Sequence, residues 1–252
     1  MDSAKLGLLT TLLLGIFIFI GALIALLIKR KEKVVDFSLG LAFGVLIMLG
    51  ITHMLPEIIE TLGIKYIYLF IIFTAIGYLI LKLLDKFIPD HDDDGKMATA
   101  HERKENLVHI GIITSLAIVL HNIIEGSAVY SSIISNASLG MSLTLGIGFH
   151  NIPLGMVIAG TFHQSNQSIS KTLLSVLLVS LSTFAGGLLM FFLGINSISP
   201  VISGILLSIT LGMLIYITFT ELFPRIKETK NKKQATIGII IGVMIQIIAH
   251  FI

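Results

Sequence analysis

Hydrophobic residues gather in long blocks along this chain, and short polar stretches separate the blocks. A helix that crosses a bilayer needs about 20 mostly apolar residues. Eight blocks approach or exceed that length: Leu6–Ile28, Phe37–Ile58, Ile67–Phe87, Leu107–Ile134, Leu139–Phe162, Ile169–Gly194, Val201–Phe223 and Ala235–Ile252. The pattern predicts an all-α integral membrane protein with eight transmembrane helices, which form a single domain over residues 1–252.

Composition narrows the class of protein. Hydrophobic residues make up 55% of the chain and charged residues only 13%, which is too apolar for a soluble domain. The lack of cysteine excludes disulfides and thiolate metal ligands. The sequence contains no basic patch suited to nucleic acid and no phosphate-binding loop of a nucleotide-driven pump. The first partner that it predicts is therefore the lipid bilayer.

The lysines and arginines predict the orientation of the chain. If the N-terminus lies outside a cell membrane, all of the 17 Lys and Arg residues except Lys5 and Lys65 fall on the inner side. Because inner loops carry the excess of positive charge, both termini are expected outside. The one long connection, residues 89–106, then lies inside. Its composition favours a flexible charged linker over a weak metal-gathering loop built on His91 and His101.

A weak echo links the second and seventh segments. His53 stands three positions before Pro56, and Glu221 stands three positions before Pro224, each near the end of its segment. Since these two segments run in opposite directions, segments one to three and six to eight are expected to be inverted repeats around a central pair, segments four and five. In transporters with such repeats, the substrate site lies near the bilayer midplane on helices broken or bent by Pro and Gly.

The central pair carries polar groups inside apolar runs. Segment four reads HNIIEG over residues 121–126, and segment five reads HNIPLG over residues 150–155. His121 and Glu125 are four residues apart, so they share one face of a helix. Ionisable groups at membrane depth are costly, which makes them functional candidates. The glycine that ends each motif allows a neighbouring helix to approach closely.

These residue types are suited to metal binding, because imidazole nitrogen and carboxylate oxygen are ordinary ligands of divalent first-row metals. We expect His121, Glu125 and His150 to form one metal site, to which Asn122 and Asn151 can add weak, neutral carbonyl oxygens. The alternative is that these groups pair with one another only to hold two helices together. The repetition of the motif on the next segment favours the metal site.

Two further residues are candidate metal ligands along a transport path. Glu221 lies in an apolar segment near its inner end, where a release-path role and a structural pair with a lysine are both open. His53 is either a gate or relay ligand or a packing residue, the more common role of a lone histidine at a helix end. Glu57 and Glu60, near the outer end of segment two, either attract cations or lie in interfacial water.

On these residues the chain resembles the ZIP (Zrt/Irt-like) metal transporters, and their prokaryotic branch in particular. His121, Asn122, Glu125 and Gly126 are similar to the family's His-Asn-x-x-Glu/Asp-Gly motif on segment four. Segment five, at residues 150–155, is similar to the His/Gln-Asn/Asp-Ile-Pro-Glu-Gly that is frequent in that branch. The resemblance covers essentially the whole chain. It implies movement of zinc or related divalent ions towards the cytosol, through a metal site between segments four and five.

The chain departs from the family pattern at two places. Leu154 replaces the carboxylate of segment five, and residues 180–185 read SLSTFA where segment six commonly supplies another glutamate. These departures disfavour a two-metal centre bridged by carboxylates, so we expect one site with less negative charge than the family norm.

The predicted function is transport of a divalent cation towards the cytosol, with Zn²⁺ as the first candidate and iron, manganese or cadmium as others. The chain is not expected to be an enzyme. A ZIP-like protein that senses or merely binds metal is the main alternative. An intramembrane metal-dependent hydrolase is a weaker one, because no second glutamate is available in segments four to six as its acid/base group. A homodimer is an open expectation, since no segment carries a specific interface signature.

Overall fold

The computed structural model describes residues 3–27, 32–86, 100–165, 167–194 and 199–251. Within these ranges the chain is helical and contains no strand. Six of the eight predicted segments correspond to single α-helices: α1 (Ser3–Leu26), α4 (Ile67–Asp85), α5 (Ala100–Ser135), α6 (Ala137–Gln164), α7 (Ile169–Leu193) and α10 (Lys232–Phe251). Six helical stretches in the described part are long and apolar enough to cross a membrane. The prediction of an all-α membrane protein is confirmed.

The long connection differs in extent from the sequence prediction. Residues 87–99, which include most of the predicted linker and His91, lie outside the described residues. Residues 100–106 were assigned to the linker, but they form the first turns of α5. Their Glu, Lys and Arg residues are good helix formers, and a helix can extend beyond the apolar block into water. The hydrophobic pattern alone therefore placed the start of this helix too late.

Segments two and seven share an irregular winding. Segment two consists of α2 (Glu32–Leu49), the π-helical turn η1 (Gly50–Met54) and α3 (Leu55–Leu62). Segment seven consists of α8 (Pro200–Tyr216), the π-helical turn η3 (Ile217–Leu222) and α9 (Phe223–Glu228). A short 3₁₀ turn, η2 (Ile64–Tyr66), joins α3 to α4.

A proline explains where each π-helical turn lies. Pro56 and Pro224 are each the second residue of the helix that follows the turn. Proline has no N–H with which to continue the i→i−4 ladder, so the winding before it loosens. The residue just before each proline instead donates its N–H five positions back, from Leu55 to Gly50 and from Phe223 to Thr218. Such turns are frequent at functional sites.

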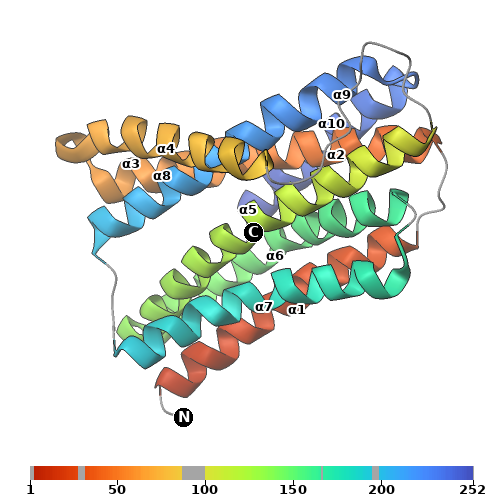
Figure 1. Cartoon of the computed structure of the whole chain (residues 1–252). Helices are drawn as coiled ribbons and strands as arrows, with labels where there is room; N and C mark the ends of the chain where they lie inside the picture. The colour runs from red at the N-terminus through yellow and green to blue at the C-terminus, as the bar shows by residue number, and fades with distance from the viewer. Residues whose placement is uncertain (1–2, 28–31, 87–99, 166, 195–198, 252) are drawn as a thin grey trace.

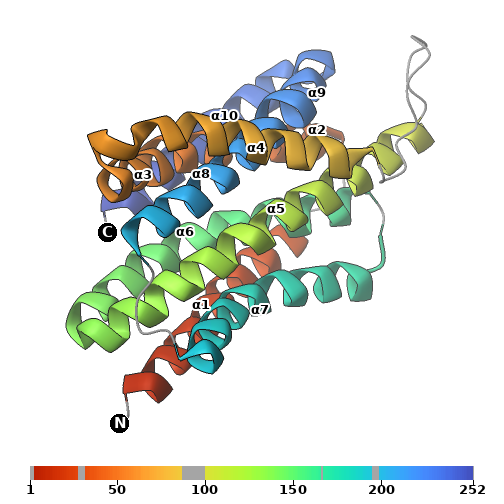
Figure 2. The same ribbon diagram turned by 60° about the vertical axis from the view of Figure 1, so that its left-hand side comes forward.

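The helices form two layers, as Figures 1 and 2 show. One layer contains α1, α5, α6 and α7, and the other contains α2, α3, α4, α8, α9 and α10. Within the first layer α1 packs on α6 and α5 on α7, while in the second α2 packs on α10 and α4 on α8. These pairs agree with the predicted repeat. Segment one packs on segment five as segment six packs on segment four, and segment two packs on segment eight as segment seven packs on segment three. One hydrophobic core joins the layers through residues such as Leu46, Met54, Ile118 and Leu154.

Glycines allow the closest helix contacts at the two motifs. A Cβ atom at Gly126 would lie 1.9 Å from the carbonyl oxygen of Thr183 on α7. A Cβ atom at Gly155 would lie 1.9 Å from the carbonyl oxygen of Ile18 on α1. No side chain fits at either position without moving the neighbouring backbone. The close approach that the sequence predicted at these glycines is confirmed, and it fixes α5 and α6 against their partners beside the motif residues.

Candidate metal centre

The motif on α5 forms a buried imidazole–carboxylate pair. His121 is fully buried and Glu125 is 4% exposed, although both lie in an apolar helix. The Nε2 atom of His121 is 2.9 Å from Oε1 of Glu125, which is the pairing that their four-residue spacing predicts. Two groups that are expensive to bury are therefore held together on one helix face.

A second His–Glu pair approaches from the other layer. His53, in the π-helical turn η1, places its Nε2 atom 3.8 Å from Oε1 of Glu125. The same Nε2 atom is 3.5 Å from Oε2 of Glu57, one turn further along on α3. We call His53, Glu57, His121 and Glu125 the His121 cluster. Because η1 and α3 belong to one layer and α5 to the other, this cluster bridges the two layers.

Asn122, which follows His121, uses its amide nitrogen to bind the neighbouring helix α7 and not the cluster. Asn122 is fully buried, and its Nδ2 donates a hydrogen bond of 3.2 Å to the carbonyl of Val179 on α7. Its Oδ1 has no hydrogen-bond partner among the described residues. Asn151 on α6 is also fully buried, and neither of its amide atoms has such a partner. Both carbonyl oxygens thus stay available, but each is neutral.

The segment-five side of the predicted site is only partly described. The side chain of His150 lies outside the described residues, so its place among the ligands stays a prediction. Leu154 is fully buried in the hydrophobic core. On α7, the hydroxyl groups of Ser180 and Thr183 are buried and have no hydrogen-bond partner among the described residues. The departures from the family pattern therefore leave neutral or apolar side chains at these positions.

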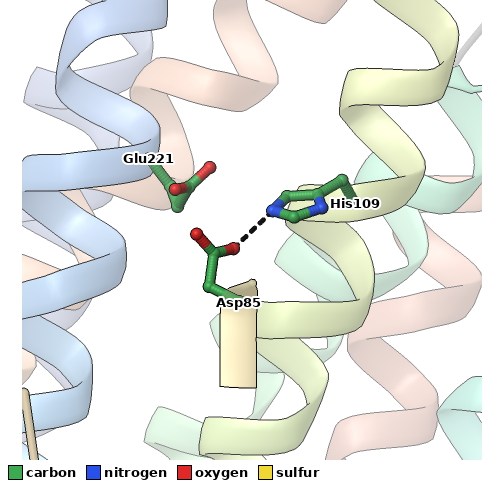
Figure 3. Close-up of side chains that lie close together, drawn as sticks. All are labelled: Asp85, His109 and Glu221. Atoms are coloured by element: carbon green, nitrogen blue, oxygen red, sulfur yellow. Dashed lines mark hydrogen bonds and ion pairs between the residues drawn. The ribbon is translucent and has the colours of Figure 1, made fainter. Parts of the chain in front are cut away.

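A second cluster lies nearer the start of α5. His109, Asp85 and Glu221 form the group of metal-competent side chains in the described ranges whose ligand atoms all lie within 4.8 Å of one another. Figure 3 shows these three side chains converging from α5, the end of α4 and the turn η3. His109 and Asp85 are joined at 2.6 Å between Nε2 and Oδ1. We call these three residues the His109 cluster.

Neighbouring groups hold the carboxylates of the His109 cluster. The hydroxyl of Tyr216 donates a hydrogen bond of 2.6 Å to Oδ2 of Asp85, so both oxygens of Asp85 are engaged. Arg225 places a guanidinium nitrogen 3.7 Å from Oε2 of Glu221. A structural pair of Glu221 with a basic residue was one of the two predictions for it, although a lysine was expected there.

The structure assigns the two predicted path residues, His53 and Glu221, to different clusters. Glu221 lies in the His109 cluster, whereas His53 joins the His121 cluster. Asp85 and His109 were missed. The signal that could have found them is the one that singled out His121, namely an ionisable residue inside or at the end of an apolar run.

Both clusters are sets of imidazole and carboxylate ligands inside a helical bundle. Donors of this kind bind divalent cations. Two such clusters along one apolar helix indicate a membrane protein that handles metal ions.

Comparison with known proteins gives the family. Residues 89–249 match the family described as ZIP Zinc transporter. A relative from Enterobacter sp. (strain 638), named Zinc transporter ZupT, is 30% identical over 94% of this chain and 93% of its own length. Another Zinc transporter ZupT, from Chlorobium chlorochromatii (strain CaD3), is 28% identical over 98% of this chain and 97% of its own. The chain belongs to the ZIP zinc transporter family, which confirms the resemblance and the expectation that it is not an enzyme.

Proposed function

We propose that the protein carries a divalent cation, with zinc as its substrate, across the cell membrane towards the cytosol. The observation that carries this proposal is the buried pair of His121 and Glu125, 2.9 Å apart in an apolar helix, with His53 facing it from the other layer. A pair that only held helices together would not need a second imidazole beside the same carboxylate oxygen. Zinc binds such nitrogen and oxygen donors readily.

The two clusters outline a path along α5. His109 and His121 are twelve positions apart in the sequence, which corresponds to about 18 Å along a helix. In Figure 2, α1 begins and α10 ends at the end of the bundle where α3 lies, and α9 lies towards the opposite end. With both termini outside, as the positive charges favour, the cation enters near α3 and binds at the His121 cluster. It then leaves past the His109 cluster into the cytosol.

The transport proposal is tested by zinc uptake into liposomes that hold the purified protein. We expect saturable uptake that is lost in Glu125→Gln, which keeps the size of the side chain but removes its charge. Glu60→Gln is the matched control, because Glu60 is an exposed carboxylate on α3. Zinc binding without any uptake above empty liposomes would contradict transport and favour the alternative of a metal sensor.

The orientation has its own test. The chain contains no cysteine, so a single cysteine introduced near either end is the only thiol. We expect a membrane-impermeant thiol reagent to label both positions from outside intact cells. Labelling only after the cells are opened would contradict the orientation and the inward direction of transport.

A further inference from the structure

Glu57 lies where it can supply a negative charge in place of the segment-five carboxylate, which Leu154 replaces in this chain. It lies in the first turn of α3, directly after Pro56, and its Oε2 atom is 3.5 Å from Nε2 of His53. Its side chain keeps 35% of its exposure, compared with 3% for Glu125. Glu57 is therefore the more exposed carboxylate of the His121 cluster.

The donor atoms of the His121 cluster follow one another at ligand-like spacing. Zinc ligands at about 2.0–2.1 Å from a tetrahedral ion lie roughly 3.3 Å from one another. The successive gaps in the cluster are 3.5 Å from Glu57 to His53, 3.8 Å from His53 to Glu125 and 2.9 Å from Glu125 to His121. The successive gaps bracket the required spacing, whereas donors that are not neighbours in the row lie farther apart, because among the described residues the His109 cluster is the group with three ligand atoms mutually within 4.8 Å. The four donors form a row, which must bend for all of them to reach one ion.

Charge balance favours a second carboxylate. With neutral imidazoles, Glu125 alone leaves a bound divalent cation with one uncompensated positive charge. An uncompensated charge at this depth is costly. Leu154 cannot supply the balance, and Asn122 and Asn151 are neutral. Glu57 would bring the total to two negative charges, which matches a divalent ion.

We propose that Glu57 is a direct ligand of the transported cation, together with His53, His121 and Glu125. The site is then built from both layers, with one His–Glu pair contributed by each. This inference rests on the proposed function, and it assigns to α3 the carboxylate role that segment five lacks. Since Glu57 is the exposed member, it takes the hydrated ion first, and the buried pair on α5 completes the coordination.

The test compares metal binding by the purified full-length protein and by Glu57→Gln, with Glu60→Gln as the matched control on the same helix. Zinc affinity is measured by equilibrium dialysis, and the ligand field by the visible absorption of Co²⁺ bound in place of zinc. We expect Glu57→Gln to lower zinc affinity at least tenfold and to change the Co²⁺ spectrum. Glu60→Gln should leave both as in the unchanged protein.

Two controls keep the outcomes apart. Glu57→Asp keeps the charge on a shorter side chain, and we expect it to recover part of the lost affinity, which a merely structural role would not predict. Zinc affinity and a Co²⁺ spectrum in Glu57→Gln that equal those of the unchanged protein would overturn the inference, even if uptake is observed. Conversely, a lowered affinity in Glu57→Gln supports the ligand role even if no uptake occurs, so the two proposals fail separately.

Discussion

The His121 and His109 clusters use the same side-chain types in opposite ways. In the His121 cluster, three successive gaps of 2.9–3.8 Å form an open row between the layers. In the His109 cluster, three ligand atoms lie within 4.8 Å of one another, and both oxygens of Asp85 are already held at 2.6 Å. An ion entering the first cluster replaces contacts between side chains that are themselves its ligands. An ion entering the second must displace hydrogen bonds that are already made.

This difference suggests a division of labour along α5. A cluster whose ligands contact one another can turn them to an ion together, so we expect it to bind the ion tightly and select it. A cluster whose carboxylate is also held by another group, as Tyr216 holds Asp85, binds the ion more weakly, which suits release. We therefore expect changes in the His121 cluster to act mainly on zinc affinity, and changes in the His109 cluster to act mainly on the rate of uptake.

The largest effect is expected from His121→Ala. Loss of a partner that only orients a ligand costs metal affinity roughly 10–100-fold, so loss of the ligand itself should cost more. Zinc affinity is measured by equilibrium dialysis, with uptake as a second readout. If affinity stays within twofold of the unchanged protein, the His109 cluster is the tighter site and the comparison is reversed.

Leu154→Glu probes the missing family carboxylate. Leu154 is fully buried in the core, so a carboxyl group placed there without metal should lower the free energy of unfolding by roughly 1–3 kcal/mol. Zinc should offset this loss, because a bound cation pairs with the new charge. Thermal unfolding with and without zinc measures both effects, and Leu154→Gln is the control of equal size. An equal zinc response in the two variants would place residue 154 away from the ion.

Asp85→Asn tests whether the His109 cluster affects the rate of uptake independently of zinc affinity. It removes the charge of Asp85 and keeps the shape, and an interaction of about 1.4 kcal/mol corresponds to a tenfold change in rate. We expect the maximal uptake rate to change by about that factor while zinc affinity, set at the His121 cluster, stays as it was. A matching fall in affinity would mean that the two clusters act as one site.

The smallest effect is expected from Tyr216→Phe, which removes only the hydrogen bond to Asp85. A hydrogen bond to a charged group contributes about 1.5–3 kcal/mol when buried and less where water can replace it. We expect a modest fall in thermal stability and no change in zinc affinity. Tyr78→Phe is a suitable control, because the hydroxyl of Tyr78 contacts Thr220 at 3.3 Å rather than a charged group.

The membrane fold could be predicted from the sequence, because a bilayer requires long apolar helices and the sequence contains long apolar blocks. The pair of His121 and Glu125 could also be predicted, since residues four apart on one helix must meet. The close approach at Gly126 and Gly155 was also predictable, because a residue without a side chain lets a neighbouring helix come near, although the sequence did not indicate which helix. In each case the signal lies within one segment.

Contacts between helices far apart in the sequence could not be predicted in this way. Asp85 and His109 meet only because the end of α4 packs beside α5, and no spacing rule relates them. The same holds for His53 and Glu125, which lie in different layers. The echo before Pro56 and Pro224 was visible, but it gave no indication that the winding there becomes π-helical.

The two π-helical turns make the alignment of the sites depend on residue count. Each turn accommodates more residues than an α-helical turn, and His53 and Glu221 lie inside these turns. Deleting one residue from such a turn would restore regular winding and leave the helices on either side in nearly the same orientation, because the wide turn absorbs one extra residue. Loss of a neutral residue such as Thr52 or Thr218 would then remove no ligand and keep the flanking helices packed as they are. A change of direction would be confined to side chains inside the turn, which include His53 and Glu221. In this protein each π-helical turn therefore holds one residue outside the regular repeat, which lets a ligand be placed without disturbing the packing of the rest of the helix.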